Sequence, residues 1–410
     1  MVQRSGWIGF GVSSALTLVL AAGCGGSNQV PTEDGGRDAK PARTDGGRDA
    51  KPVRSDGGKD ATVSDSGRDT MHEDGASDAA RDALAADALP PGCEAGPQGE
   101  PTDLRCTGLY ADWASKTVAA NVRQYDPGLH LWSDGASKTR WIYLPPGTKI
   151  DTSDMDEWAF SPGTKVWKEF VVDGARLETR LLWKRPSGNW YFTTYRWAAD
   201  GSSAPELTDG ELDADGNNYE IPTQSACYDC HNGRIDAVLG FEAVALSSPQ
   251  AAGVTMATLT AQNLLTDPPT SPLTIPGDAP TAAALGYLHM NCGNPCHNDG
   301  NGEAANTGLW MRLGVATLTS PQATDTWTTG VGAHANYALT GVDAPQDFTP
   351  CDPDQSAAYY RMDHRDGVDG AMDGTQMPPI VSHQVDPDGV ALVAAWLNGF
   401  PQCPSGSTTP

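Results

Sequence analysis

Apolar and polar residues are distributed very unevenly along this chain of 410 residues. The first ninety residues hold almost no aromatic side chains, whereas eight tryptophans lie between Trp113 and Trp197. Hydrophobic residues make up 39% of the whole chain, which is enough for a folded core. The aromatic residues among them are concentrated in the later part of the sequence. We therefore expect the folded body to begin near Cys93.

The segment from Cys93 to about Ser248 has the pattern of an antiparallel sheet. Runs of aromatic and β-branched residues are joined by short turns, and Asp173-Gly174 supplies the positive φ angles that a tight hairpin needs. We expect a meander in which most of the tryptophans form sheet core. The predicted strands are 139–144, 166–172, 176–183 and 190–197.

Helical patterns dominate the later part of the chain, and one further helix is expected before the strands, from about Leu109 to Val122. Asp278 and Asp386 are each expected to cap a helix that opens near a proline. The fold class expected is α+β, with an antiparallel β-rich domain followed by a mainly α domain. The predicted later helices are 254–265, 280–289, 354–362 and a final helix that ends at Gly399.

The N-terminus has the pattern of an export signal. Arg4 precedes an apolar run from Trp7 to Leu20, which is too short to span a bilayer, and Ala21-Ala22-Gly23 then leads to Cys24. This arrangement resembles a bacterial lipobox, in which the cysteine becomes the lipidated first residue. The alternative is an ordinary signal with a stray cysteine. We expect an exported protein, lipid-anchored to a bacterial membrane and facing the periplasm or cell surface.

The segment after the signal is a degenerate repeat with a period of eleven residues. Asp34–Pro41 recurs as Asp45–Pro52 and, in a shorter form, as Asp56–Ala61. Such a mixed-charge, glycine-rich repeat buries too little apolar surface to offset chain entropy. We predict a disordered tether. The domains expected are the signal (1–24), the linker (25–92), the β-rich domain (93–248), a connector (249–278), the mainly α domain (279–403) and a tail (404–410).

The formal net charge of −25 argues against nucleic acid as a partner, because binding to phosphates needs a basic face. An acidic surface is compatible with docking onto a basic redox partner protein, although acidic surfaces also simply keep proteins in solution.

The most informative motif is Cys227-Tyr228-Asp229-Cys230-His231. Two cysteines three apart with a histidine after the second form the attachment pattern of c-type haem. In that chemistry Cys227 and Cys230 form thioether links to the haem vinyl groups, and His231 becomes the proximal iron ligand. The alternatives are a redox disulfide or half of a zinc site.

A second motif, Cys292-Gly293-Asn294-Pro295-Cys296-His297, has one residue more than the usual spacing. The distance between the haem vinyl groups is fixed, so the longer loop must bulge, and Gly293 and Pro295 are suited to that. If this motif also holds haem, Cys292 and Cys296 are the covalent links and His297 is the proximal ligand. Alone, the motif is equally consistent with a disulfide.

The remaining cysteines, apart from Cys24, number four: Cys93, Cys106, Cys351 and Cys403. An even remainder in an oxidising compartment predicts two disulfides. The local pairing joins Cys93 to Cys106 and Cys351 to Cys403, but the sequence alone does not fix it.

The order of elements after residue 278 resembles the class I cytochrome c fold, with a helix, a Cys-His motif, a Met-Pro loop and a C-terminal helix. In that fold a loop methionine is the sixth iron ligand, and Met377, followed by two prolines, matches that position. The ordinary alternative for Met377 is core filling. The resemblance implies a cytochrome c-like C-terminal domain.

A wider resemblance covers residues 105–400. Several segments look like a family of exported bacterial dihaem c-type cytochromes: Leu131–Ala136, Trp167–Phe170, Glu178–Leu182, Cys227–His231, Tyr287–Cys292 and the Met-Pro-Pro loop. The family is mostly uncharacterised, and some members are joined to sugar-dehydrogenase-like domains. The resemblance implies two haem c groups and electron transfer, and it implies no substrate.

The sixth ligand of the first haem is not determined by the sequence, because several side chains are candidates. If none of them binds the iron, the open site could activate a small oxidant, as in a dihaem peroxidase, or the chain could accept electrons within a dehydrogenase complex. A third possibility is a haem-free surface binding protein whose cysteines form disulfides. The candidate ligands are His130, Met155, Met256, His289 and His334.

Overall fold

The computed structural model describes residues 89–403, except 217, 237, 301, 303, 338, 340–343 and 366–373. The predicted signal peptide with Cys24, residues 25–88 of the predicted linker and the tail 404–410 lie outside the described residues. None of the helices in the described ranges is both long and apolar enough to cross a membrane.

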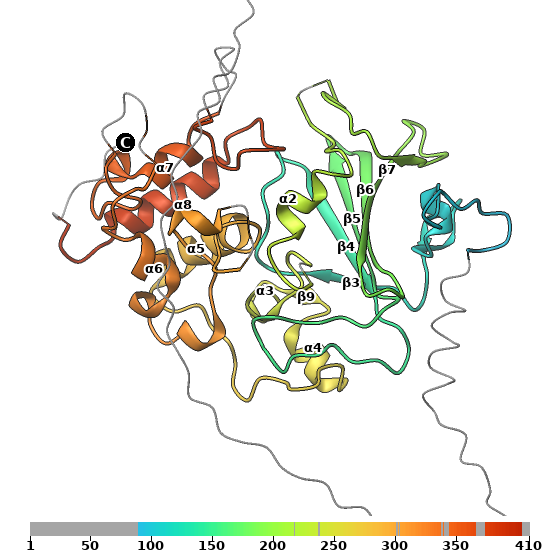
Figure 1. The fold of residues 1–410 in the computed structure, drawn as a ribbon, viewed down its shortest axis with the longest axis horizontal. Coiled ribbons are helices and arrows are strands. Elements are labelled where there is room, and N and C mark those ends of the chain that lie inside the picture. Colours follow the sequence, from blue (N-terminus) through green and yellow to red (C-terminus); the bar gives the residue numbers. More distant parts are fainter. Residues whose placement is uncertain are drawn as a thin grey trace, which may run out of the picture. The chain divides into compact units, whose positions relative to one another are not determined.

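A seven-stranded sheet with the order β8-β7-β6-β5-β4-β3-β9 forms the β-rich part, and every neighbouring pair in it is antiparallel (Figure 1). The predicted meander is confirmed, because β4 to β7 are paired in chain order. Asp173 (φ 48°) and Gly174 (φ 79°) form the tight turn between β5 and β6. The strands are β3 (Arg123–Asp126), β4 (Ser137–Tyr143), β5 (Lys165–Val172), β6 (Ala175–Lys184), β7 (Trp190–Arg196), β8 (Glu206–Leu207) and β9 (Ala252–Gly253).

The helix expected from Leu109 to Val122 is wrong. This segment contains the short antiparallel pair β1 (Tyr110–Asp112) and β2 (Thr117–Val118), and Lys116 between them has a positive φ of 56°. Trp113 stacks on Trp197 with 5.1 Å between ring centroids. This contact with a residue far away in the sequence fixes the turn, because tertiary packing overrides weak helix propensity.

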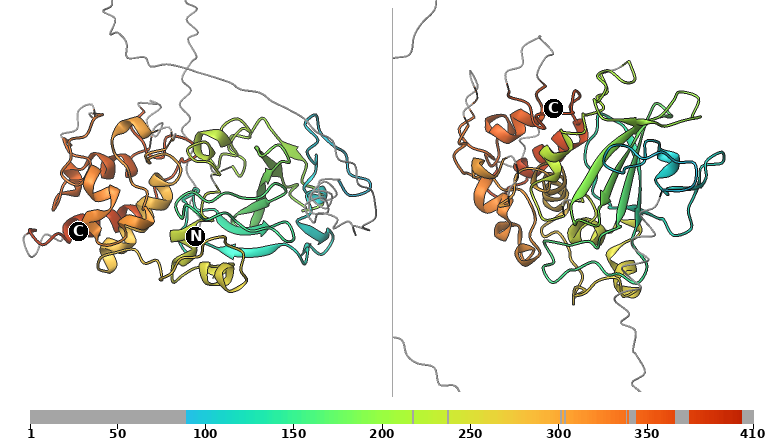
Figure 2. Two further views of the ribbon diagram at one scale, coloured as in Figure 1. Left: turned by 60° about the horizontal axis from the view of Figure 1, so that its bottom comes forward. Right: turned by 45° about the vertical axis from the view of Figure 1, so that its right-hand side comes forward.

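The two faces of the sheet are covered differently. One face carries Trp141, Trp167 and Leu181, which are directly opposite one another and pack with Leu104 and Leu109 of the N-terminal segment. That segment, which includes η1 (Leu104–Cys106), lies on the side of the sheet away from the helices (Figure 2). The tryptophans of this face are sheet core, as predicted.

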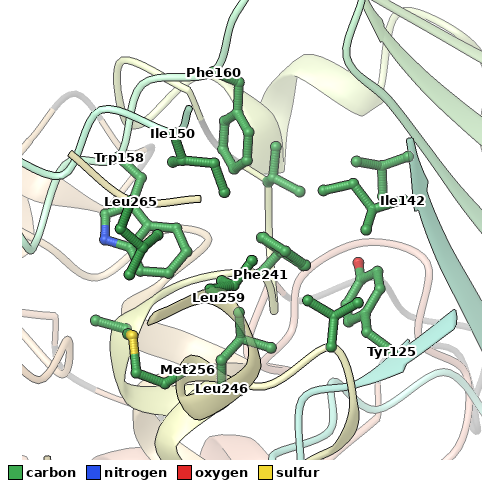
Figure 3. Packing of buried hydrophobic residues seen from close by; sticks show 14 of the residues in the cluster. Tyr125, Ile142, Ile150, Trp158, Phe160, Phe241, Leu246, Met256, Leu259 and Leu265 are labelled. Atoms are coloured by element: carbon green, nitrogen blue, oxygen red, sulfur yellow. The ribbon is translucent and has the colours of Figure 1, made fainter. Parts of the chain in front are cut away.

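The opposite face is apolar near one end of its strands. There Ile142, Leu182 and Phe192 pack against the segment that follows the first Cys-His motif. Figure 3 shows Ile142 and Tyr125 turned towards Phe241 and Leu259 in this cluster. The segment includes α3 (Ala243–Ser247) and α4 (Met256–Ala261), so the predicted connector is in large part packed onto the sheet.

The helical part contains the two helices whose caps were predicted. Asp278 accepts a hydrogen bond from Thr281 N at the start of α5 (Ala279–Leu288), and Asp386 accepts one from Gly389 N at the start of α8 (Pro387–Asn398). The remaining elements are α2 (Cys227–His231), η2 (His289–Gly293), η3 (Ala305–Thr307), η4 (Val315–Thr317), η5 (Pro321–Ala323), α6 (Asp325–Gly330), η6 (Pro353–Gln355) and α7 (Ala357–Met362).

Two disulfides join Cys93 to Cys106 and Cys351 to Cys403, which is the local pairing predicted from the sequence. The described residues belong to one compact unit in which the sheet and the helices share contacts. The architecture is therefore mixed α+β, with the antiparallel sheet first and most of the helices after it.

Candidate functional site

A single cavity of about 770 Å³ lies between the sheet and the helical part, and both Cys-His motifs line it. Its volume is within the range typical of small-molecule and cofactor sites. The cavity brings together predicted site residues that are up to 150 positions apart in the sequence. The predicted site residues on its wall are Cys227, Cys230, His231, Cys292, Cys296, His297 and Met377.

The first motif forms the short helix α2, which lies between the strands and helices α5 and α8 (Figure 1). None of its five residues is fully buried, and Tyr228 is 46% exposed. Phe192 of β7 contacts the rings of both Tyr228 and His231, each with 5.1 Å between centroids. Burial of the thiol raises the pKa of Cys227. The first motif is thus a helical turn that packs against β7 of the sheet.

The second motif begins in a π-helical turn, η2, which explains its extra residue. Asn294 N donates to His289 O over 2.7 Å and His297 N to Cys292 O over 2.8 Å, so each bond spans five residues. A π-turn accommodates one residue more than an α-turn. Gly293 is required there, since a Cβ atom would lie 2.3 Å from Arg312 N.

The imidazole of His297 has a defined orientation. Its Nδ1 lies 3.1 Å from the carbonyl oxygen of Leu309, so Nδ1 carries a proton and Nε2 keeps its lone pair. Burial lowers the pKa of His297 and favours this neutral form. A backbone carbonyl that fixes the tautomer in this way is the usual support of a metal-binding histidine.

The two motifs touch one another. The Cys296 thiol donates to the carbonyl oxygen of Asp229, with 4.0 Å between sulfur and oxygen, and its interaction with Cys230 lowers the pKa of the Cys230 thiol. Arg234, three residues after His231, donates to Asn294 Oδ1 over 3.1 Å. All four motif cysteines are free thiols in this structure. Neither a disulfide within a motif nor one between the motifs is formed.

Met377 lies in a loop that the chain holds against the cavity. Its backbone N–H donates to Arg361 O over 2.8 Å. The side chain of Gln376 donates to Pro378 O and Ser382 O, over 2.9 and 3.0 Å, and so closes the loop on itself. The position of Met377 on the cavity wall therefore has direct support from neighbouring residues.

Asp134, in the segment Leu131–Ala136, binds the backbone of the loop that carries Met377 from the side of the sheet. Its carboxylate accepts from the backbone N–H groups of His383 and Gln384, over 2.7 and 3.2 Å. Trp132 N donates to Asn291 Oδ1 over 2.6 Å, which joins the segment to the second motif. In the sequence, this segment is marked only by the family resemblance, which gives it no role.

None of the five candidate ligands for the first haem lies on the cavity wall. Met155 and Met256 pack in the apolar cluster beneath the sheet, and His130 pairs with Asp126 over 2.6 Å. His334 is exposed, in a β-bridge with Gln346. His289 is fully buried between Glu242 and Leu313 N.

Two methionines that the sequence analysis passed over, Met311 and Met362, do line the cavity. Both are almost completely buried, and neither stands in a motif that could have indicated it. Within the described part of the chain, no three His, Cys, Asp or Glu side chains are grouped as a metal site.

Comparisons with known proteins gave no match for this chain among protein-family models, curated proteins or solved structures.

Proposed function

We propose that the chain is a dihaem c-type cytochrome, tethered to a membrane, that transfers electrons outside the cytoplasmic membrane. The observation that supports this best is that four free thiols, two imidazoles and the thioether of Met377 line the same cavity. These are the residue types that c-type haem attachment requires, present once in the usual sequence motif and once in a variant with one more residue between the cysteines.

Each residue has a definite role in this proposal. Cys227 and Cys230 hold one haem and Cys292 and Cys296 the other. His231 and His297 are the proximal ligands, and Met377 is the distal ligand at the second site, which makes the C-terminal domain cytochrome c-like. Haem supplies a one-electron Fe(III)/Fe(II) couple.

The contact between Cys230 and Cys296 supports electron exchange between the two sites, because both attachment points face one cavity. A lipid at Cys24 and the linker 25–92 would hold this body near a membrane, where a redox partner protein reaches it. The net charge of −25 suits a partner with a basic surface.

The direct test is a haem count. The full chain, exported in a host that attaches c-type haem, is expected to give two haems per chain by pyridine haemochrome. Cys227→Ala/Cys230→Ala and Cys292→Ala/Cys296→Ala should each give one. A matched control, Cys93→Ala/Cys106→Ala, removes two cysteines outside the cavity and should keep both haems. A count of zero in the unaltered chain would overturn the proposal and favour a haem-free binding protein.

A second function, a dihaem peroxidase-like enzyme or the electron-accepting module of a dehydrogenase complex, rests on one observation. The five side chains expected as possible distal ligands of the first haem all lie away from the cavity. Absorption and electron paramagnetic resonance spectra of the resting protein decide this point. A high-spin, five-coordinate haem that disappears in Cys227→Ala/Cys230→Ala favours the enzyme, and two low-spin haems favour the electron carrier.

A further inference from the structure

Four cationic side chains of the sheet point into the cavity: Lys138, Arg140, Lys168 and Arg180. Arg140 of β4 is directly opposite Lys168 of β5, and Lys168 is directly opposite Arg180 of β6. Directly opposite residues share a face of the sheet, and Lys138 lies two residues before Arg140 on that same face. We call these four side chains the cationic row.

The buried positive charges of the cationic row lower the stability of the fold unless they are compensated. Like charges directly opposite on neighbouring strands repel one another, and burial removes the water that would screen them. Arg140 is only 4% exposed and Lys168 only 7%. The chain as a whole is strongly acidic, with 52 acidic and 27 basic residues. A buried run of positive charge in such a chain needs a specific compensating partner.

The protein itself compensates only part of the positive charge of the cationic row. Glu178 binds Arg180 through two hydrogen bonds of 2.6 and 2.9 Å, and this is the row's one ion pair among the described residues. Lys168 donates to the carbonyl oxygen of Leu239 over 3.0 Å, and Lys138 to that of Leu131. A carbonyl oxygen is a hydrogen-bond acceptor without a net charge.

The carboxylates on the cavity wall are Asp134, Glu220, Asp229 and Asp347. Asp134 is bound to the backbone of the Met377 loop, and Glu220 pairs with His383 over 2.9 Å. None of the four forms an ion pair with the row among the described residues. Burial, together with Arg140 and Arg180, lowers the pKa of Lys168 to about 7, which agrees with an excess of positive charge.

We propose that the cationic row is an anion-binding site of the cavity, which takes carboxylate groups or another small oxyanion. The anion has two possible sources with this shared chemistry. One is the carboxylates of a haem held by the motif cysteines, and this source rests on the proposed function. The other is a free oxyanion that enters the cavity, which does not depend on haem attachment.

The test uses the sign of a stability change. Without a bound anion, Lys168→Met or Arg140→Gln removes one of several mutually repelling charges and should raise the Tm of the full chain. With a bound anion, each substitution removes an attractive contact, and the Tm should fall by about 3 °C or more. Arg123→Gln, on the neighbouring strand β3 and outside the cavity, is the matched control and should change little.

A titration of the unaltered protein with inorganic phosphate separates the two sources. A saturable rise in Tm that Lys168→Met abolishes indicates a free oxyanion. No response to phosphate, with a lower Tm and a lower midpoint potential of one haem in both variants, indicates haem carboxylates. A higher Tm in both variants without any response to phosphate overturns the proposal.

The haem count of each preparation keeps this proposal separate from the proposed function. If no haem is attached but phosphate binds saturably, the anion site stands and the cytochrome assignment fails. If two haems are attached and both variants are stabilised, the cytochrome assignment stands and the anion site fails.

Discussion

The two Cys-His motifs differ far more in their surroundings than in their sequence. The first forms an α-turn whose residues are all at least partly exposed, and it packs against Phe192 of β7. The second begins in a π-turn that is largely buried, and a backbone carbonyl orients its histidine. The comparison teaches that two motifs of nearly the same sequence can differ in how firmly they are held, because the surrounding fold decides their hydrogen bonds and burial.

The support around the second motif comes from several directions. Glu242 of α3 accepts hydrogen bonds from Val244 N and Ala245 N and pairs with His289, the first residue of η2. Asp134 and Gln376 hold the loop that carries Met377. At the first motif, the charge of Arg180 in the cationic row acts on both Cys227 and Cys230. We therefore expect the second site to be the more rigid, higher-potential one, and the first to be more open to solutes.

The largest expected effect is that of Met377→Ala on redox behaviour. Thioether ligation favours Fe(II), and axial ligands tune haem potentials over about 0.8 V, so one of two midpoint potentials should fall by ~100 mV or more. Potentiometric titration measures both potentials. Met256→Leu, a methionine change outside the cavity, is the control. If Met377→Ala leaves both potentials unmoved, Met377 is not a ligand.

Glu242→Gln should destabilise the second motif. Burial raises the pKa of Glu242, but His289 and the N–H groups of Val244 and Ala245 outweigh this and lower it to about 2. The substitution should cost about 3 kcal/mol in the free energy of unfolding at pH 7. Because the folded pKa is depressed, this stability is present above about pH 4.5 and is lost as the pH falls towards 2.

Urea unfolding at pH 7 and pH 3 measures this effect, with the exposed Asp209→Asn as control. The difference between Glu242→Gln and the unaltered chain should shrink at the lower pH. An equal difference at both pH values would mean that the charge of Glu242 contributes nothing.

Asp134→Asn should loosen the Met377 loop. Asparagine keeps one acceptor oxygen but places an amide donor against backbone donors, at a cost of about 2 kcal/mol. Amide hydrogen exchange at His383 and Gln384 should become at least about tenfold faster, while exchange in β5 and β6 stays unchanged. Uniform acceleration across the sheet would contradict a local fastening role.

Tyr228→Ala should have the smallest effect, because Tyr228 is about half exposed and makes one edge-to-face contact with Phe192. We expect a loss of about 1 kcal/mol or less in the free energy of unfolding and two attached haems. Chemical denaturation and a haem count measure both. A loss above about 3 kcal/mol would show that the first motif is held as firmly as the second.

The sequence by itself determined those parts of the fold that depend on local chemistry. Alternating strands around Asp173-Gly174 and the caps at Asp278 and Asp386 were predicted, because neighbouring residues decide them. The helix at 109–122 was predicted wrongly, because Trp113 stacks on Trp197, more than eighty residues away. No pattern within the segment carries that information.

At the candidate functional site, too, local sequence determined some features and tertiary structure determined others. Both motifs could be found from their spacing, and Met377 from the resemblance of its loop to that of a class I cytochrome c. The tertiary structure decided that all three line one cavity and that the two motifs approach one another at Cys230 and Cys296. It also decided that the five candidate ligands lie elsewhere. The cationic row exists only through the strand register that aligns Arg140, Lys168 and Arg180. Register depends on hydrogen bonds between distant segments, so only the folded chain could reveal it.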